Sequence, residues 1–124
     1  MEIENQYKSL VESLRILALP YEEQRSCLPN YVIVQDEVIA MFDDAFLLLP
    51  QIIDAEFLDK KSIASIIRCF NWMNIMTRNN EIDVDFLKNN DGWQKVRYLA
   101  TQALTDIKEL KGKLDISHID WISD

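Results

Sequence analysis

Four carboxylates that fall within nine residues have the most evident capacity for chemistry in this sequence. They lie in the stretch 34–50, VQDEVIAMFDDAFLLLP, and are Asp36, Glu37, Asp43 and Asp44. Carboxylates grouped on a helix can hold Mg²⁺ or Mn²⁺ for phosphate chemistry, or they can bind a basic protein surface. The metal site needs a second acidic helix facing the first, and the segment 60–77 contains no acid. A carboxylate-metal phosphohydrolase is therefore the less favoured alternative.

Other catalytic chemistry has few candidate residues. His118 is the only histidine, so a Ser-His-Asp triad, a Cys-His pair or a histidine-rich metal site would all depend on it. Asp83 and Asp85 resemble part of a calcium loop but lack its remaining ligands and its glycine. Nucleic-acid binding is disfavoured because it rests on Lys and Arg, and this chain is acid-rich. We expect a protein that is not an enzyme and that holds no metal or cofactor.

The spacing of residues in 34–50 predicts a helix with one buried face and one acidic face. Seven residues make nearly two helical turns, so the two early acids should lie above the two later ones. Leu47 falls between the two acidic columns and should stand in solvent, while Asp54 and Glu56 follow near the end of the stripe. An apolar side chain inside an acidic rim is typical of an interface. The residues that we expect to bind a partner are Asp36, Glu37, Asp43, Asp44, Leu47, Asp54 and Glu56.

The net charge of −8 is concentrated in one segment. Residues 21–57 contain eight acids and a single base, Arg25, whereas residues 58–124 contain ten of each. An acidic face can simply keep a protein soluble, but such an uneven distribution also suits the capture of a basic partner.

The helices that must position these acids follow from hydrophobic periodicity. Long helices are expected over 2–19, 34–50, 60–77 and 91–110, with short helices after Pro20, after Pro50 and around 84–87. The chain should form one all-α domain, 1–124, a compact bundle of about four long helices plus short ones. The tail 113–124 has enough apolar residues to dock on the body.

Several finer expectations accompany this assignment. In the first helix Glu4, Lys8, Glu12 and Arg15 should point outward, with Glu4 close to Lys8. The last helix should begin at Asp91, with Gln94 completing a capping box, and it should end at Gly112. Cys27 and Cys69 should both be small buried residues. In the helix over 60–77 the core positions should be Ile63, Ile66, Ile67, Phe70 and Met73. Trp72 projects from the opposite side, so this helix either lies in the middle of the bundle, buried on two sides, or presents an aromatic side chain outward.

The sequence contains no apolar run of the roughly 20 residues that span a bilayer, and its N-terminus lacks the pattern of a signal peptide. We expect a monomer in the cytosol that does not bind a membrane.

Three stretches resemble the small helical immunity proteins of bacterial contact-dependent inhibition and related polymorphic toxin systems. They are LPNYVIVQDEVIAMFDDAFLLLP, FNWMN and DGWQKVRYLATQAL. The resemblance implies a cytosolic protein that binds a cognate toxin domain, often a nuclease, and occludes its active site. The acids Asp36, Glu37, Asp43 and Asp44 would then imitate the charge of the substrate in a basic cleft, with Leu47 as an apolar anchor. The alternative is an acidic adaptor or regulatory subunit that uses the same face for another basic partner.

Overall fold

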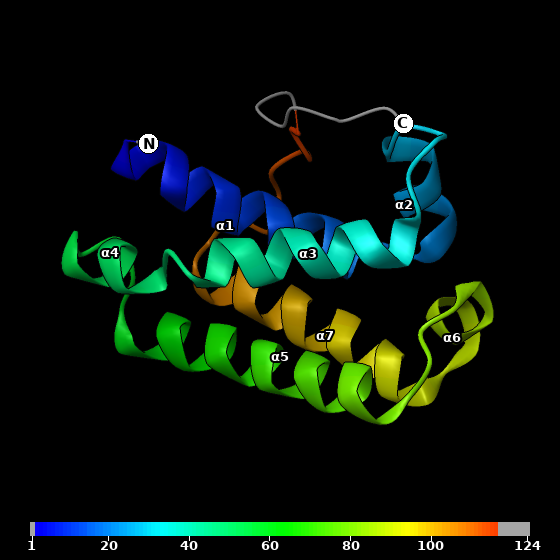
Figure 1. The fold of residues 1–124 in the computed structure, drawn as a ribbon. Helices are drawn as coiled ribbons and strands as arrows, with labels where there is room; N and C mark the ends of the chain where they lie inside the picture. Colours follow the sequence, from blue (N-terminus) through cyan, green and yellow to red (C-terminus); the bar gives the residue numbers. More distant parts are fainter. Residues whose placement is uncertain (1, 117–124) are drawn as a thin grey trace.

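The computed structural model describes residues 2–116, and every regular element within them is an α-helix (Figure 1). The helices are α1 (Ile3–Ala18), α2 (Tyr21–Cys27), α3 (Val34–Phe46), α4 (Leu49–Asp54), α5 (Lys60–Asn79), α6 (Val84–Asn89) and α7 (Asp91–Asp106). The all-α fold class that the hydrophobic periodicity predicts is confirmed for this part of the chain.

The buried apolar side chains form one hydrophobic core, to which the short helices α4 and α6 contribute as well as α1, α3, α5 and α7. α1 packs against both α3 and α7, whereas α5 packs mainly against α7 and over a smaller area against α3. The largest fully buried side chains include Leu10 and Leu14 of α1, Phe42 of α3, Met73 of α5 and Trp93 of α7. Because α3 and α5 touch over only a small area, part of each helix near their junction stays outside the core.

Helix α3 has the predicted buried face but is shorter than the predicted 34–50. Val38, Phe42 and Ala45 are buried, as the three- and four-residue spacing requires. The helix ends at Phe46 because Pro50 has no N–H to donate to the Phe46 carbonyl, and its ring would clash with that carbonyl. Pro50 instead lies in the first turn of α4, where a missing N–H costs nothing.

Helix α7 begins at Asp91, as predicted, but its cap and its C-terminal end differ from the prediction. The cap is Asn90 rather than Asp91, and its Oδ1 accepts a hydrogen bond from the N–H of Trp93 at 3.1 Å. At the other end the helix stops at Asp106 rather than at Gly112, and Lys108 takes the left-handed conformation, with a φ of 63°, that follows the ends of many helices. Leu110 therefore lies beyond the end of this helix, and its side chain is exposed.

The prediction that Glu12 and Arg15 point into solvent is wrong. The Glu12 side chain is only 2% exposed and that of Arg15 is 12% exposed. Both are covered by the segment 107–116, which follows α7 and crosses back over α1. The expected partnership of Lys8 is also different, since its Nζ lies 2.7 Å from a carboxylate oxygen of Asp115.

The prediction that the tail 113–124 docks on the body concerns described residues only up to 116. Leu114 and Ile116 pack against the core and are partly buried, as a docked tail requires. The rest of the predicted tail, with His118, lies outside the described residues.

The two cysteines are free and lie in different environments. Cys69 is buried as predicted, and burial raises the pKa of its thiol to about 12. Cys27 is exposed at the end of α2, so the prediction that it is a buried residue is wrong.

Trp72 is half-buried against the start of α7. Of the two arrangements that the sequence allows for this side of α5, the partly covered one is observed. Its indole Nε1 donates a hydrogen bond to the Gly92 carbonyl at 2.8 Å, and the Lys95 ammonium lies 4.0 Å from the ring centroid. Gly92 also allows Met76 of α5 to pack closely on the start of α7, because a Cβ at Gly92 would collide with the Met76 sulfur.

Candidate functional site

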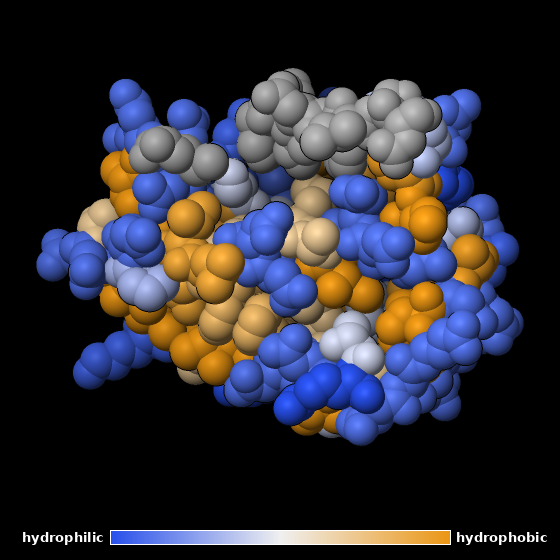
Figure 2. Space-filling view, in the orientation of Figure 1, coloured by the Kyte–Doolittle hydropathy of each residue, from blue (hydrophilic) through white to orange (hydrophobic). Residues whose placement is uncertain are grey.

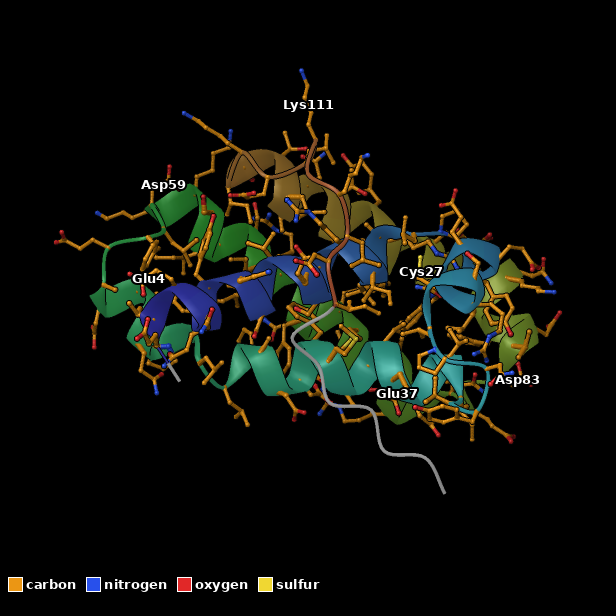
Figure 3. All side chains as sticks on the ribbon, turned by 90° about the horizontal axis from the view of Figure 1, so that it is seen from above. Glu4, Cys27, Glu37, Asp59, Asp83 and Lys111 are labelled. Carbon is orange, nitrogen blue, oxygen red and sulfur yellow. The ribbon has the colours of Figure 1, made fainter. Side chains whose placement is uncertain are left out.

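The outward face of α3 carries the four predicted carboxylates. Asp36 and Asp44 are exposed, and Glu37 and Asp43 are half-buried. Figure 3 shows where Glu37 lies, on the outer side of the helix. Leu47, the first residue after the helix, is 74% exposed, more than any other large hydrophobic side chain among the described residues. We call Asp36, Glu37, Asp43, Asp44 and Leu47 the acidic face.

The two pairs of acids differ in their effect on the helix. Asp36 and Glu37 lie in the first turn of α3, where negative charge interacts favourably with the positive end of the helix dipole. Asp43 and Asp44 lie in the last turn, where negative charge opposes the dipole, and that turn contains no basic residue. The first pair therefore has a role in stabilising the helix, whereas the second pair has an electrostatic cost.

Asp43 shows this cost in its ionisation. Its pKa is raised above the ordinary aspartate value, first by burial and second by the neighbouring carboxylate of Asp44. Both effects disfavour the charged form of Asp43. An aspartate that is kept in such a position is a candidate for function rather than for stability.

The acids of α3 form no ion pair within residues 2–116. Arg25 is the only base in residues 21–57, and it does not pair with these acids. Its guanidinium instead donates hydrogen bonds to the carbonyls of Pro29 and Val32. The acid from this segment that does form an ion pair is Glu22, whose Oε1 lies 3.1 Å from the Lys88 ammonium. The acidic face therefore remains available to an external cation.

Asp54 and Glu56 are less closely tied to this face than we predicted. Both are exposed, but Asp54 ends α4 and Glu56 follows it, beyond the turn that separates α4 from α3 (Figure 1). Glu56 adopts the left-handed conformation with a φ of 63°, and its N–H donates to the Ile53 carbonyl at 2.9 Å to close the helix end. They extend the acidic region but do not continue the columns of α3.

An apolar surface on α5 that we did not predict lies beside the acidic face. Ile67 was expected in the core, yet it is 37% exposed. Phe70, one turn further along α5, is half-buried, and its ring stacks on Phe46 of α3 with centroids 3.7 Å apart. Figure 2 shows apolar side chains gathered over the C-terminal half of α3 and the adjoining part of α5. Periodicity marked these α5 residues as apolar, but only the tertiary arrangement shows that they are not fully covered.

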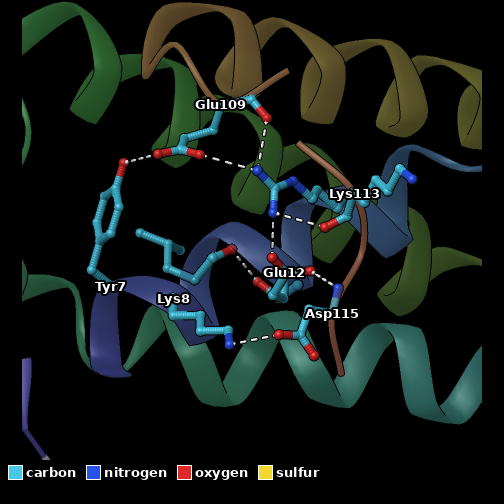
Figure 4. A network of polar contacts seen from close by, with 9 residues as sticks. Tyr7, Lys8, Glu12, Glu109, Lys113 and Asp115 are labelled. Carbon is cyan, nitrogen blue, oxygen red and sulfur yellow. Dashed lines mark hydrogen bonds and ion pairs between the residues drawn. The ribbon is translucent and has the colours of Figure 1, made fainter. Parts of the chain in front are cut away.

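A second polar cluster lies between α1 and the segment 107–116 (Figure 4). The Arg15 guanidinium donates to the carboxylates of Glu12 and Glu109 and to the carbonyls of Glu109 and Lys113. Glu12 also accepts the backbone N–H of Asp115 at 2.6 Å. Tyr7 lies beside this cluster. Burial and the neighbouring Glu109 carboxylate raise the pKa of Tyr7 to about 12.

This cluster lines an open surface hollow of about 290 Å³, whose three acidic and three basic side chains balance one another in charge. Its acids and bases satisfy one another and fasten the segment to α1. We therefore interpret it as a structural clasp and not as the functional site.

A scan of protein-family models, a search of curated proteins and a search of solved structures all found no match for this chain. The functional interpretation consequently depends on the geometry of the described residues. Among these residues no group of three or more His, Cys, Asp or Glu side chains is arranged to hold a metal ion. Within the same range, none of the helices has the length and apolar character needed to cross a membrane.

Proposed function

We propose that this protein is an immunity protein, which binds a basic bacterial toxin domain and blocks its active-site cleft with the acidic face of α3. Asp43 and Asp44 carry the proposal, because they oppose the helix dipole, have no cationic partner within residues 2–116, and adjoin the exposed Leu47. A nuclease is the expected toxin, since its cleft must attract phosphates and therefore attracts carboxylates in the same way. The protein would act in the cytosol as a monomer, by binding and not by catalysis.

The fold supports this use of α3. In the proposed arrangement the four longest helices form one compact bundle. The buried residues of α3 pack on α1, and the opposite side of α3 is left to a partner. A rigid, preformed face binds with a smaller loss of conformational entropy than a flexible loop does. Its charge should also accelerate association, from roughly 10⁵–10⁶ M⁻¹s⁻¹ toward 10⁸–10⁹ M⁻¹s⁻¹ at low salt.

The test uses a panel of basic nuclease toxin domains with the wild-type chain and the variant Asp43→Lys/Asp44→Lys. We expect the wild type to bind one domain and inhibit its nuclease activity, and the variant to associate at least tenfold more slowly. The matched control is Glu81→Lys/Asp91→Lys, which changes the net charge equally at two exposed acids outside α3. Circular dichroism establishes that each variant is folded.

Each outcome has a defined meaning. Equal loss of binding by the control would show that only net charge matters and would contradict the role of α3. Unchanged binding by the variant would exclude the acidic face. Binding of a basic protein without inhibition of any nuclease would instead favour the adaptor alternative, which uses the same acids.

A further inference from the structure

The junction of α3 and α5 contains an apolar surface as well as carboxylates. Phe46 and Phe70 stack with their ring planes 2° apart and both remain partly exposed, so together they form an apolar floor between the two helices. On α5, Ile63 and Ile67 precede Phe70 by seven and three residues, which places them on the same side of that helix. Ile63 is half-buried and Ile67 is 37% exposed. The result is an apolar strip that runs along α5 next to α3.

The α3 side of this junction is acidic. Asp43 precedes Phe46 by three residues, and Asp36 precedes Asp43 by seven. Because α3 and α5 run in opposite directions (Figure 1), these carboxylates continue the seam beyond the Phe70 end of the strip. Asp43 is half-buried, and burial is the main reason that its pKa is raised. Asp43 therefore lies at one end of the strip and is already partly removed from water, whereas Asp36 lies further along α3 and is exposed.

We propose that the junction of α3 and α5 is a docking seam for a basic amphipathic helix of the partner. The apolar side of that helix would cover Phe46, Ile67 and Phe70, and its Lys or Arg residues would pair with Asp36 and Asp43. This inference rests on the proposed function, because it identifies the part of the partner that the acidic face recognises. It adds that recognition requires an apolar helix face and not positive charge alone.

Two physical reasons favour this occupant. A helix is a partner shape that the junction of two adjacent helices accepts, since its side chains fit between theirs. The sign of the charge favours a cationic partner over a second copy of this chain, because two copies would bring their own acids together across the seam. An anionic membrane or nucleic acid would be repelled for the same reason.

The probe is a fluorescently labelled synthetic helix built from Leu, Ala and Lys, with Leu at three- and four-residue spacing and Lys on the opposite side. A second peptide has the same composition in scrambled order, so its charge is equal but its apolar residues share no face. Fluorescence polarisation measures the affinity, and NMR chemical shifts of the ¹⁵N-labelled full chain locate the site. We expect the amphipathic peptide to bind at least tenfold more tightly, with shifts concentrated in 36–47 and 63–70.

Two substitutions test the seam itself. Ile67→Gln should weaken binding of the amphipathic peptide at least fivefold, because it makes the strip polar. The matched control is Tyr98→Gln on α7, which also removes an exposed apolar side chain, 60% exposed in the structure, but on a helix that does not form the seam. Equal affinity for the two peptides, or chemical shifts confined to other helices, would overturn the proposal. Dimerisation of the unliganded chain that Ile67→Gln abolishes would overturn it as well.

The toxin experiment separates the seam from the proposed function. If a nuclease is inhibited through Asp43 and Asp44 but Ile67→Gln has no effect on its binding, the seam is wrong and the function stands. If no toxin is inhibited while the amphipathic peptide occupies the seam, the function is wrong and the seam stands.

Discussion

Replacing Arg15 by Met should be among the most destabilising substitutions in this chain. The carboxylate of Glu12 is 2% exposed, and Arg15 is the cation that compensates it. Removing one partner of a buried ion pair typically costs about 3–5 kcal/mol, because the remaining charge is left in a medium of low polarity. Glu12 keeps one hydrogen bond, from the N–H of Asp115, so we expect the lower end of that range, about 3 kcal/mol. That is a large part of the about 5–15 kcal/mol that stabilises a typical domain.

The assay is urea unfolding at pH 7, followed by circular dichroism, for the wild type, Arg15→Met, Glu12→Gln and the double variant. The double variant has no buried charge to leave uncompensated, so it should regain at least about 2 kcal/mol relative to Arg15→Met. Lys8→Met serves as the control. It removes an ion pair whose side chains are 41% and 46% exposed, and such pairs contribute at most about 1 kcal/mol.

Two results would refute this reasoning. The first is unfolding of Arg15→Met at nearly the wild-type urea concentration, which would mean that Glu12 is not held as a buried charge. Alternatively, the two single substitutions could add without coupling, which would mean that the side chains do not act as a pair.

Three further predictions concern other parts of the molecule. Gly112→Ala should lower the free energy of unfolding by about 1–3 kcal/mol, as measured by urea unfolding, because its Cβ would occupy the space of the Arg15 guanidinium. Asp43→Asn should raise the free energy of unfolding, as measured by urea unfolding, at pH 7 but not at pH 3. The pKa of Asp43 is raised in the folded state, so its charged form lowers stability above the unfolded pKa of about 4. Below that pH the carboxyl is protonated in both states and has no such effect. A thiol reagent should modify Cys27 in the native protein and Cys69 only after unfolding, because burial raises the pKa of the Cys69 thiol to about 12 and shields it.

Local patterns predicted the helices and much of the buried surface. Apolar spacing placed α1, α3, α5 and α7 within a few residues of their observed positions, because each of these helices buries one face. Helix ends were less predictable, since neighbouring residues compete for them. Asn90 and Asp91 are both good capping residues, and nothing in the local sequence shows that Asn90 is used.

The burial of Glu12 and Arg15 could not be predicted from α1 alone. Their polarity and spacing are those of an exposed helix face, and the residues that cover them lie about 100 positions later in the chain. The same limit applies to the site. A seven-residue period placed Asp36, Asp43 and their neighbours on one side of a helix, but the exposed position of Ile67 depends on how closely α5 approaches α3.

The acids at the end of α3 differ from the acids around α1, and the difference supports a functional origin for the acids of α3. Around α1 the carboxylates of Glu12 and Glu109 are satisfied by Arg15, so this fold readily pairs an acid with a base where stability requires it. At the end of α3 a Lys or Arg in place of Asp43 would interact favourably with the helix dipole and relieve the repulsion from Asp44. A solubility role does not require acids at that unfavourable position, since acids in the first turn of α3 supply charge and stabilise the helix as well. The unfavourable interactions of Asp43 and Asp44 with the helix dipole and with each other would be relieved only when an external cation binds beside them. Their relief would then contribute to the affinity of the complex.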